Sequence, residues 1–309
     1  YKLNQSFINV QSKTVLKTVL ASVNIKNECD KVFSENRPHI VFHAAAYKHV
    51  PLVEINPINS INNNIFSTLN ICIASKELSL KKVLMISSDK AVRPTNIMGA
   101  SKRLSEIIVQ AFAYDAEKNT LNKKDQKTCF SMVRFGNVLS SSGSAVPLFI
   151  KQIASGGPVT LTHPKITRYF MTIKEASQLV IQSSAMAQGG EVFLLDMGKS
   201  ICIKDLVIKL IKLSGLQLKD NSNPYGDIEI KITGLRPGEK LFEELLIDAE
   251  AEKTDHPLIF RAKENFIMMD EIIPKLEILK KNIDDRNKHQ VLNLLNELVK
   301  EWENQNKIN

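Results

Sequence analysis

Asp89 and Lys90 are adjacent residues that directly follow the apolar run "KKVLMISS". In an open α/β sheet, ligands bind in the crevice outside the carboxyl ends of the strands, so the pair has a position suited to chemistry. A carboxylic acid beside an amine can protonate one atom and deprotonate its neighbour, which is what a β-elimination requires. An isolated Asp-Lys pair is more often a solvated ion pair at a strand end, so both interpretations stay open.

A second pair of interest lies in "NIMGASKR", where Lys102 follows Met98 by four residues. This spacing is about one helical turn, so the two side chains face the same side. A methionine side chain neither ionises nor donates a hydrogen bond, so Met98 cannot be a base and serves at least partly as core packing.

Small residues follow an apolar run nearer the N-terminus, in His43-Ala44-Ala45-Ala46. Such residues let a cofactor approach the backbone closely, but simple helix–sheet packing explains them equally well. Neither His43 nor His49 has partners at metal-ligand spacing, so we expect no metal site.

Strands and helices alternate along the part of the chain that must position these residues. The apolar pattern predicts strands at 15–23, 39–46, 81–88 and 129–139, and helices at 26–36, 58–78 and 98–118. This alternation implies right-handed βαβ crossovers and a parallel α/β sheet covered on both faces. After about residue 145 the elements become shorter; the turn "RPGEK" is expected to precede an apolar helix, "LFEELL", and an amphipathic helix is predicted around 287–303.

Composition narrows the class of protein. The chain has 309 residues, 43% of them hydrophobic, and a formal charge of +8. Its lysines are dispersed without interleaved aromatics, which argues against nucleic-acid binding, whereas a positive field suits an anionic nucleotide diphosphate as well as it suits solvated lysines. No apolar run reaches the roughly 18–20 residues of a membrane helix, so we expect no membrane contact from this segment. Four cysteines without CxxC spacing favour reduced thiols and a cytoplasmic location.

Five motifs occur in order: "IVFHAAAYKHVPLVE", "SSDKAVRPTNIMGASKR", "RFGNVLSSSGSAVPLF", "THPKITRYFMT" and "GLRPGEKLFEELL". Over nearly the whole chain they resemble the extended short-chain dehydrogenase/reductase family, within it the polysaccharide-biosynthesis dehydratases that act on UDP-N-acetylglucosamine. The resemblance implies a Rossmann-type NAD(P) domain at 1–145, an interleaved substrate lobe at 146–309, and a homo-oligomer. Methionine at position 98 resembles the long branch of the family, whose full-length form is anchored at the cytoplasmic face of the inner membrane.

The resemblance also implies a role for each matched residue. Lys90 would remove the sugar C5 proton, Asp89 would protonate the departing C6 hydroxyl, and Lys102 would bind the nicotinamide ribose. Because Met98 occupies the position of a tyrosine base, the C4 hydroxyl proton must leave through Ser88, a bound water or Lys102. The residues implied for NAD or NADP are Ala44, Ala45, Lys48 and Asn64, and those for the UDP-sugar are Asn137, Arg168, Arg236 and Glu239.

The sequence departs from the family at one point, because all 12 glycines lie at or after Gly99. The Gly-rich turn that holds a dinucleotide pyrophosphate is therefore missing, and the opening "YKLNQSF" resembles the helix after the second strand of the family. We expect a fragment that lacks its first βαβ half-unit, binds a dinucleotide poorly and exposes an unpaired sheet edge or apolar face.

The leading hypothesis is a nucleotide-sugar 4,6-dehydratase that uses NAD(P)+ transiently. Two alternatives remain: an epimerase of the same family, and a non-catalytic, cofactor-deficient fragment. The Asp89-Lys90 pair argues against simple 4-epimerisation, which needs neither an acid at C6 nor a base at C5.

Overall fold

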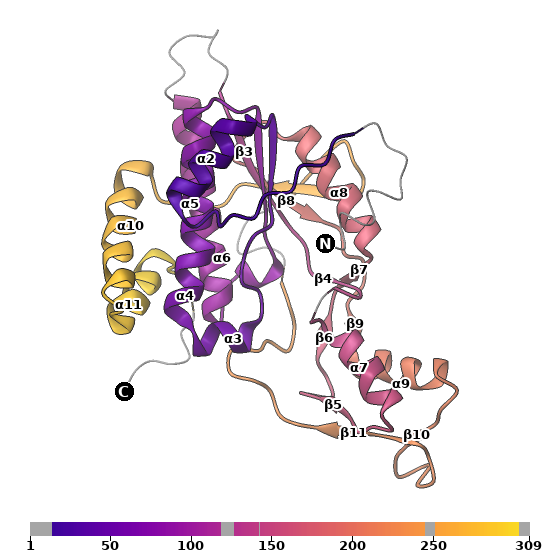
Figure 1. The fold of residues 1–309 in the computed structure, drawn as a ribbon. Coiled ribbons are helices and arrows are strands. Elements are labelled where there is room, and N and C mark those ends of the chain that lie inside the picture. The colour runs from indigo at the N-terminus through magenta and orange to yellow at the C-terminus, as the bar shows by residue number, and fades with distance from the viewer. Residues whose placement is uncertain (1–13, 119–126, 142, 245–250, 303–309) are drawn as a thin grey trace.

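The computed structural model describes residues 14–118, 127–141, 143–244 and 251–302 (Figure 1). Its main sheet has the order β1-β2-β3-β8-β13-β12. The strands are β1 (Ile40–His43), β2 (Lys82–Ile86), β3 (Cys129–Arg134), β8 (Val192–Leu195), β13 (Ile259–Ala262) and β12 (Glu252–Lys253). The strands β1, β2, β3 and β8 are parallel to one another, whereas β13 pairs antiparallel with both β8 and β12. This arrangement confirms the predicted α/β class with a mostly parallel sheet.

Helices cover both faces of this sheet, as Figure 1 shows. One face carries α2 (Lys26–Asn36), α5 (Ser67–Glu77), α6 (Ile97–Lys118), α10 (Met269–Asp284) and α11 (Lys288–Leu298), and the other carries α8 (Ile173–Met186). The alternation along β3 explains the two layers, since Met132 packs in the first core and Val133 in the second. Short helices α3 (Val50–Ile55) and α4 (Pro57–Ile61) and a π-helical turn, η1 (Asn62–Phe66), precede α5.

A smaller lobe projects from the large sheet in Figure 1. It combines α7 (Ala145–Ala154) and α9 (Ile203–Leu213) with a parallel sheet of β10 (Leu218–Lys219), β11 (Ile228–Ile232) and β5 (Val159–Leu161) around its own apolar core. Two ladders, β4 (Asn137–Val138) with β7 (Phe170–Met171) and β6 (Thr167–Arg168) with β9 (Ile201–Cys202), lie outside both of these sheets. Because β8 and β13 belong to the main sheet, residues after 145 are shared between the two lobes.

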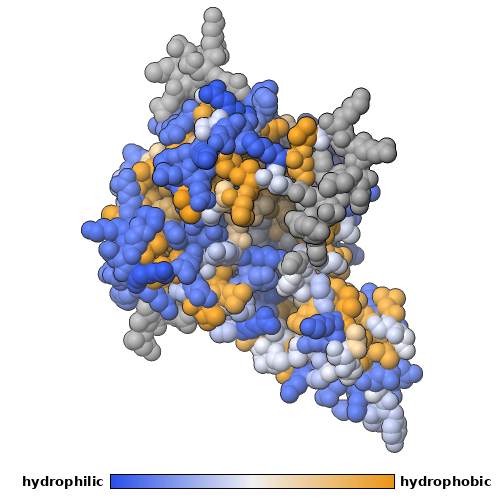
Figure 2. All heavy atoms as spheres, in the orientation of Figure 1, coloured by the Kyte–Doolittle hydropathy of each residue, from blue (hydrophilic) through white to orange (hydrophobic). Residues whose placement is uncertain are grey.

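Three local predictions were wrong. Residues 15–23 form no strand: they pair with none of the described strands, and Leu20 is fully exposed. The strand predicted at 39–46 is β1, but the buried position that its apolar run favours is wrong: β1 is an edge strand with Ile40 and Phe42 nearly half exposed, which agrees with the expected unpaired sheet edge. Figure 2 shows apolar side chains interrupting the polar surface in the upper part of the view, where Figure 1 has the sheet edge.

The third concerns "LFEELL", predicted as a helix after the "RPGEK" turn. Residues 241–244 are not helical, and 245–246 lie outside the described residues, as does the helix predicted at the start of the chain. The helices predicted at 26–36, 58–78 and 98–118 are confirmed as α2, as α4 to α5 with the π-helical turn between them, and as α6.

Candidate active site

A cleft of about 510 Å³ lies where the carboxyl ends of β1, β2 and β3 face the smaller lobe. Its walls include ten of the predicted site residues: Ala44, Lys48, Ser88, Lys90, Met98, Lys102, Asn137, Arg168, Arg236 and Glu239. A larger cavity of about 690 Å³, beside α6 and β13, is lined by none of the predicted residues. The sheet therefore gathers the predicted chemistry into one cleft, as parallel strand ends do in this fold class.

The turn after β2 presents two polar groups to the cleft and hides a third. Backbone hydrogen bonds from Ser87 N to Val133 O (2.8 Å) and from Asp89 N to Phe135 O (3.2 Å) tie this turn to β3 and the residue after it. Ser88 and Lys90 line the cleft, whereas Asp89 is fully buried behind them. Ser88 Oγ donates to Asp89 Oδ1 (2.8 Å), and Lys90 Nζ donates to the same oxygen (2.9 Å).

Asp89 Oδ2 is buried and has no hydrogen-bond partner among the described residues. It faces Gly136, where a Cβ atom would lie 3.3 Å from Oδ2 and 3.1 Å from the Cβ of Tyr169. A side chain at position 136 would crowd this oxygen. We expected an acid and an amine side by side in the cleft. Instead, the Asp89 carboxylate is buried and is connected to the cleft by its hydrogen bonds to Ser88 and Lys90.

Three charged groups surround Lys90. Besides the contact with Asp89, Lys90 Nζ lies 3.5 Å from Glu243 Oε1, and the same oxygen lies 3.5 Å from Arg168 Nε. Burial lowers the pKa of Lys90, but the negative charges of Asp89 and Glu243 outweigh it, so the pKa lies above its usual value. Sequence reasoning missed Glu243; the available signal was a further carboxylate four residues after Glu239 in "GLRPGEKLFEELL".

Met98 and Lys102 lie on the first turns of α6. Gly99 allows this helix to approach Lys90, since a Cβ at position 99 would lie 2.2 Å from the Lys90 carbonyl oxygen. Met98 is 3% and Lys102 8% exposed, and Lys102 Nζ donates to Ile86 O (2.8 Å) at the end of β2. Burial lowers the pKa of Lys102 to about 8, with the Glu106 charge opposing the shift.

The residues after β1 only partly match the prediction. Ala44, Ala46 and Lys48 line the cleft, and Ala45 does not. Asn64, on η1, is 1% exposed and does not line the cleft. Its side chain accepts from Tyr47 N (2.7 Å) and donates to Tyr47 O (3.1 Å) and Ser101 Oγ (2.9 Å). Asn64 therefore holds the loop between β1 and α3 against α6.

The polar residues of the smaller lobe are connected to one another. Arg168 Nη2 lies 3.7 Å from Glu239 Oε1, which also accepts from Thr162 Oγ1 (3.1 Å), and Glu239 Oε2 accepts from Arg236 N (3.0 Å). Arg236 is exposed and Arg168 mostly buried. Two guanidinium groups at one wall form a site suited to a diphosphate, because each planar fork can bond two oxygens.

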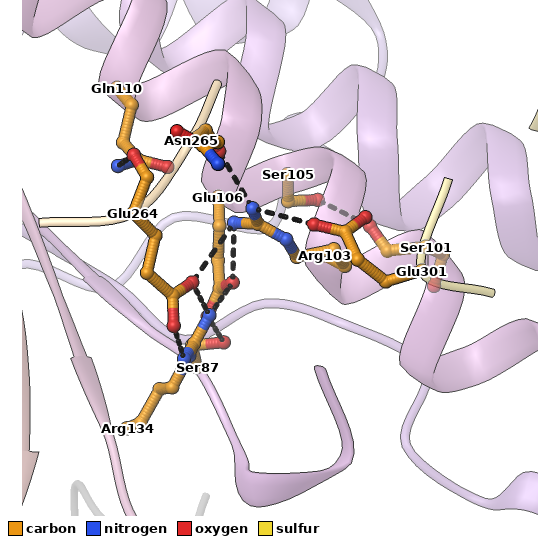
Figure 3. A network of polar contacts seen from close by, with 10 residues as sticks. All are labelled: Ser87, Ser101, Arg103, Ser105, Glu106, Gln110, Arg134, Glu264, Asn265 and Glu301. Carbon is orange, nitrogen blue, oxygen red and sulfur yellow. Dashed lines mark hydrogen bonds and ion pairs between the residues drawn. The ribbon is translucent and has the colours of Figure 1, made fainter. Parts of the chain in front are cut away.

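A buried ionic network supports the cleft from behind (Figure 3). Arg134, at the end of β3, donates two hydrogen bonds to Glu106 on α6 (2.7 and 2.6 Å) and two to Glu264 after β13 (2.7 and 2.6 Å). Arg103 joins it, with Nη2 donating to Glu301 (3.2 Å), and Ser87 Oγ donates to Glu106 Oε1 (2.6 Å). Burial raises the pKa of Glu106, but the two arginines outweigh this effect and lower it. The network thus joins the turn after β2, the end of β3 and the α6 helix to the segments that follow β13 and α11.

Glu264→Ala is expected to lower the free energy of unfolding by about 3–5 kcal/mol, because it removes two hydrogen bonds to the buried Arg134 and one of the carboxylates that neutralise the two buried arginines. Glu252→Ala is the matched control: its carboxylate pairs with Arg261 at 3.0 Å on the surface, where both side chains are well exposed. We expect the control to cost less than about 1 kcal/mol. Urea denaturation of both variants measures the difference, and equal losses would contradict a supporting role for the network.

No group of three or more His, Cys, Asp or Glu side chains in the described ranges is placed to hold a metal ion. Within the same residues, no helix combines the length and the apolar character needed to cross a bilayer.

Comparison with known proteins gives consistent matches. Residues 1–264 match the family described as "Polysaccharide biosynthesis protein". The capsular polysaccharide biosynthesis protein CapD of Staphylococcus aureus is 48% identical over 279 residues, which cover 90% of this chain and 43% of CapD. This chain therefore spans less than half of that relative's length.

Two solved structures have the same fold. Pen from Bacillus thuringiensis superimposes with a TM-score of 0.71 at 31% identity, covering 86% of this chain and 78% of Pen. DesIV from Streptomyces venezuelae, a dTDP-glucose 4,6-dehydratase with NAD and TYD bound, gives a TM-score of 0.64 at 16% identity, covering 78% and 74%. At that identity DesIV supports the fold alone. By its family match, its relative and its fold, the chain belongs to the polysaccharide biosynthesis protein family, whose members are epimerase- and dehydratase-type extended short-chain dehydrogenases/reductases.

Proposed function

We propose that this site performs the 4,6-dehydration of a UDP-N-acetylhexosamine, within a longer protein that makes precursors of surface polysaccharide. One observation carries the proposal: a hydroxyl, a carboxyl and an amine, on Ser88, Asp89 and Lys90, are hydrogen-bonded to one another at a strand end beside the cleft. A dehydratase needs an acid at C6 and a base at C5, which an epimerase acting at C4 does not.

NAD or NADP is the proposed cofactor, and DesIV, which has the same fold, binds NAD. Ala44 and Ala46 leave space for a flat ring, and Lys48 and Lys102 can donate to ribose hydroxyls, so the residues fit the nicotinamide end. When bound, the cofactor accepts a hydride from C4 and returns it to C6. No glycine precedes Gly99, so these residues supply no glycine-rich turn for the pyrophosphate.

The hydrogen-bond chain suggests how the site works without a tyrosine. Ser88 Oγ would take the proton of the C4 hydroxyl and pass its own to Asp89 Oδ1, to which it already donates at 2.8 Å. The protonated Asp89 would later return that proton through Ser88 to the C6 oxygen, which leaves as water. O4 and O6 of a hexopyranose are close neighbours, so one hydroxyl can serve both. Lys90 would take the C5 proton and give it back, while Arg168 and Arg236 bind the diphosphate.

A substrate carrying deuterium at C4 tests the proposal in the complete protein. We expect the label at C6 of a product that has lost one water, because one hydride moves from C4 to C6 within each turnover. Mass spectrometry locates the label. A product of unchanged mass would establish an epimerase, and a dehydrated product without the label at C6 would exclude the proposed mechanism.

A further inference from the structure

Glu243 is a buried carboxylate shared by two cations. Its Oε1 lies 3.5 Å from Lys90 Nζ and 3.5 Å from Arg168 Nε, and the residue is 8% exposed. Oε2 is buried and makes no hydrogen bond to any described residue. One oxygen is therefore held beside Lys90, and the other is free to carry a proton.

The proposed reaction leaves Lys90 with a proton that must go elsewhere. A base at C5 must be a neutral amine, yet Lys90 donates to Asp89 at 2.9 Å, and its two carboxylate neighbours favour the ammonium form. Asp89 cannot accept this proton as well, because it receives the C4 hydroxyl proton in the same cycle. Glu243 is the other carboxylate in contact with Lys90 among the described residues.

We propose that Glu243 is the proton acceptor that converts the Lys90 ammonium into the C5 base, an inference that rests on the dehydratase activity proposed above. An N–H bond of Nζ breaks and an O–H bond forms on Glu243, so the positive and the negative charge disappear together. Lys90 then takes the C5 proton and returns it to C5 at the end of the cycle. Glu243 finally gives its proton back to Lys90, and no co-reactant is consumed.

The charges around Lys90 and Glu243 place the proton transfer between them after the oxidation at C4. Protonation of Asp89 during C4 oxidation removes one of the two negative charges that hold Lys90 as a cation, so transfer to Glu243 becomes easier only after oxidation. The Lys90 and Glu243 side chains are 24% and 4% exposed, so water solvates their charges only in part, which narrows the free-energy gap between the ion pair and the neutral pair. Among the described residues, the other charged or titratable groups that line the pocket shared by Lys90 and Glu243 are Lys48, His49, Arg168, Arg236, Glu239 and Lys240.

Glu243→Gln tests the inference in the complete protein with its cofactor bound. Glutamine cannot accept the proton, so elimination near neutral pH should fall by about 10²–10⁴-fold while C4 oxidation continues. As pH rises toward the pKa of Lys90, solvent removes the proton directly, and elimination should recover about tenfold per pH unit. Product mass measured across pH gives the rate of elimination, and Glu243→Asp should retain much of the wild-type rate and its flat pH profile.

Glu244→Gln is the matched control, because Glu244 is an exposed neighbour that pairs with Arg93 at 3.2 Å. It should leave rate and pH profile unchanged. If Glu243→Gln lowers the rate of elimination by the same factor at every pH, Glu243 has a structural role and the inference is overturned. A wild-type rate of elimination in this variant would also overturn the inference. Failure of the wild-type protein to oxidise C4 would instead overturn the proposed function itself.

A second measurement does not depend on turnover. The rate of Lys90 acetylation as a function of pH, followed by mass spectrometry, reports the pKa of its amine. Because the Glu243 charge raises the pKa of Lys90, Glu243→Gln should shift the midpoint to lower pH. An unmoved midpoint would mean that Glu243 does not act on Lys90.

Discussion

Lys90→Ala should abolish elimination in the complete protein and leave C4 oxidation intact. Oxidation requires a positioned nicotinamide and an exit for the hydroxyl proton, whereas elimination also requires a base at C5. Loss of such a base typically costs about 10²–10⁴ in rate. We expect reduced cofactor and a 4-keto sugar to accumulate, with no exchange of the C5 proton for solvent deuterium, as measured by absorbance and by NMR.

Lys174→Ala is a suitable control, because it removes an exposed lysine from α8, outside the cleft. It should behave as wild type. Met98→Tyr in the Lys90→Ala background restores a phenol one turn before Lys102 and should not restore elimination, since a phenol there serves C4 and not C5. Exchange of the C5 proton at the original rate in Lys90→Ala would place the base on another residue.

Ser88→Ala should slow C4 oxidation by about 10²–10⁴-fold, because it removes the hydroxyl that connects O4 to Asp89. Ser88 Oγ also accepts from Lys90 N (3.2 Å), so the substitution removes a small capping interaction as well. Ser88→Thr keeps the hydroxyl and should keep most of the rate. Single-turnover appearance of reduced cofactor measures this step directly.

The double variant Ser88→Ala/Met98→Tyr distinguishes the two roles of the Ser88 hydroxyl, proton transfer from O4 and the hydrogen bond that it accepts from Lys90 N. A phenol at position 98 gives the C4 proton an independent exit, so oxidation should recover although the cap is still missing. If Ser88→Ala oxidises C4 at the wild-type rate, the proton leaves through Lys102 or a water, the two other routes that the sequence left open.

The sequence by itself determined the parallel α/β sheet and the local position of the chemistry. A parallel strand that is covered on both faces is a continuous apolar run, such as "KKVLMISS". The run therefore marks the strand, and the polar residues that follow it mark the end of the strand. The spacing of Met98 and Lys102 on one helical face is equally local. Ten predicted residues line the cleft, and for those next to β1 and β2, such as Ala44, Ser88 and Lys90, adjacency to a strand end decides where the side chain emerges.

Only the tertiary structure decided which of these groups meet. Asp89 lies behind Ser88 and Lys90 because the turn after β2 is hydrogen-bonded to residues 133 and 135, and Asn64 is committed to Tyr47 because a π-helical turn carries it there. Glu243 reaches Lys90 from a segment that the pattern assigned to a helix and that the structure leaves irregular. Such contacts join residues far apart in the chain, and their charges act through space over a few ångströms, so no local pattern of residue types encodes them.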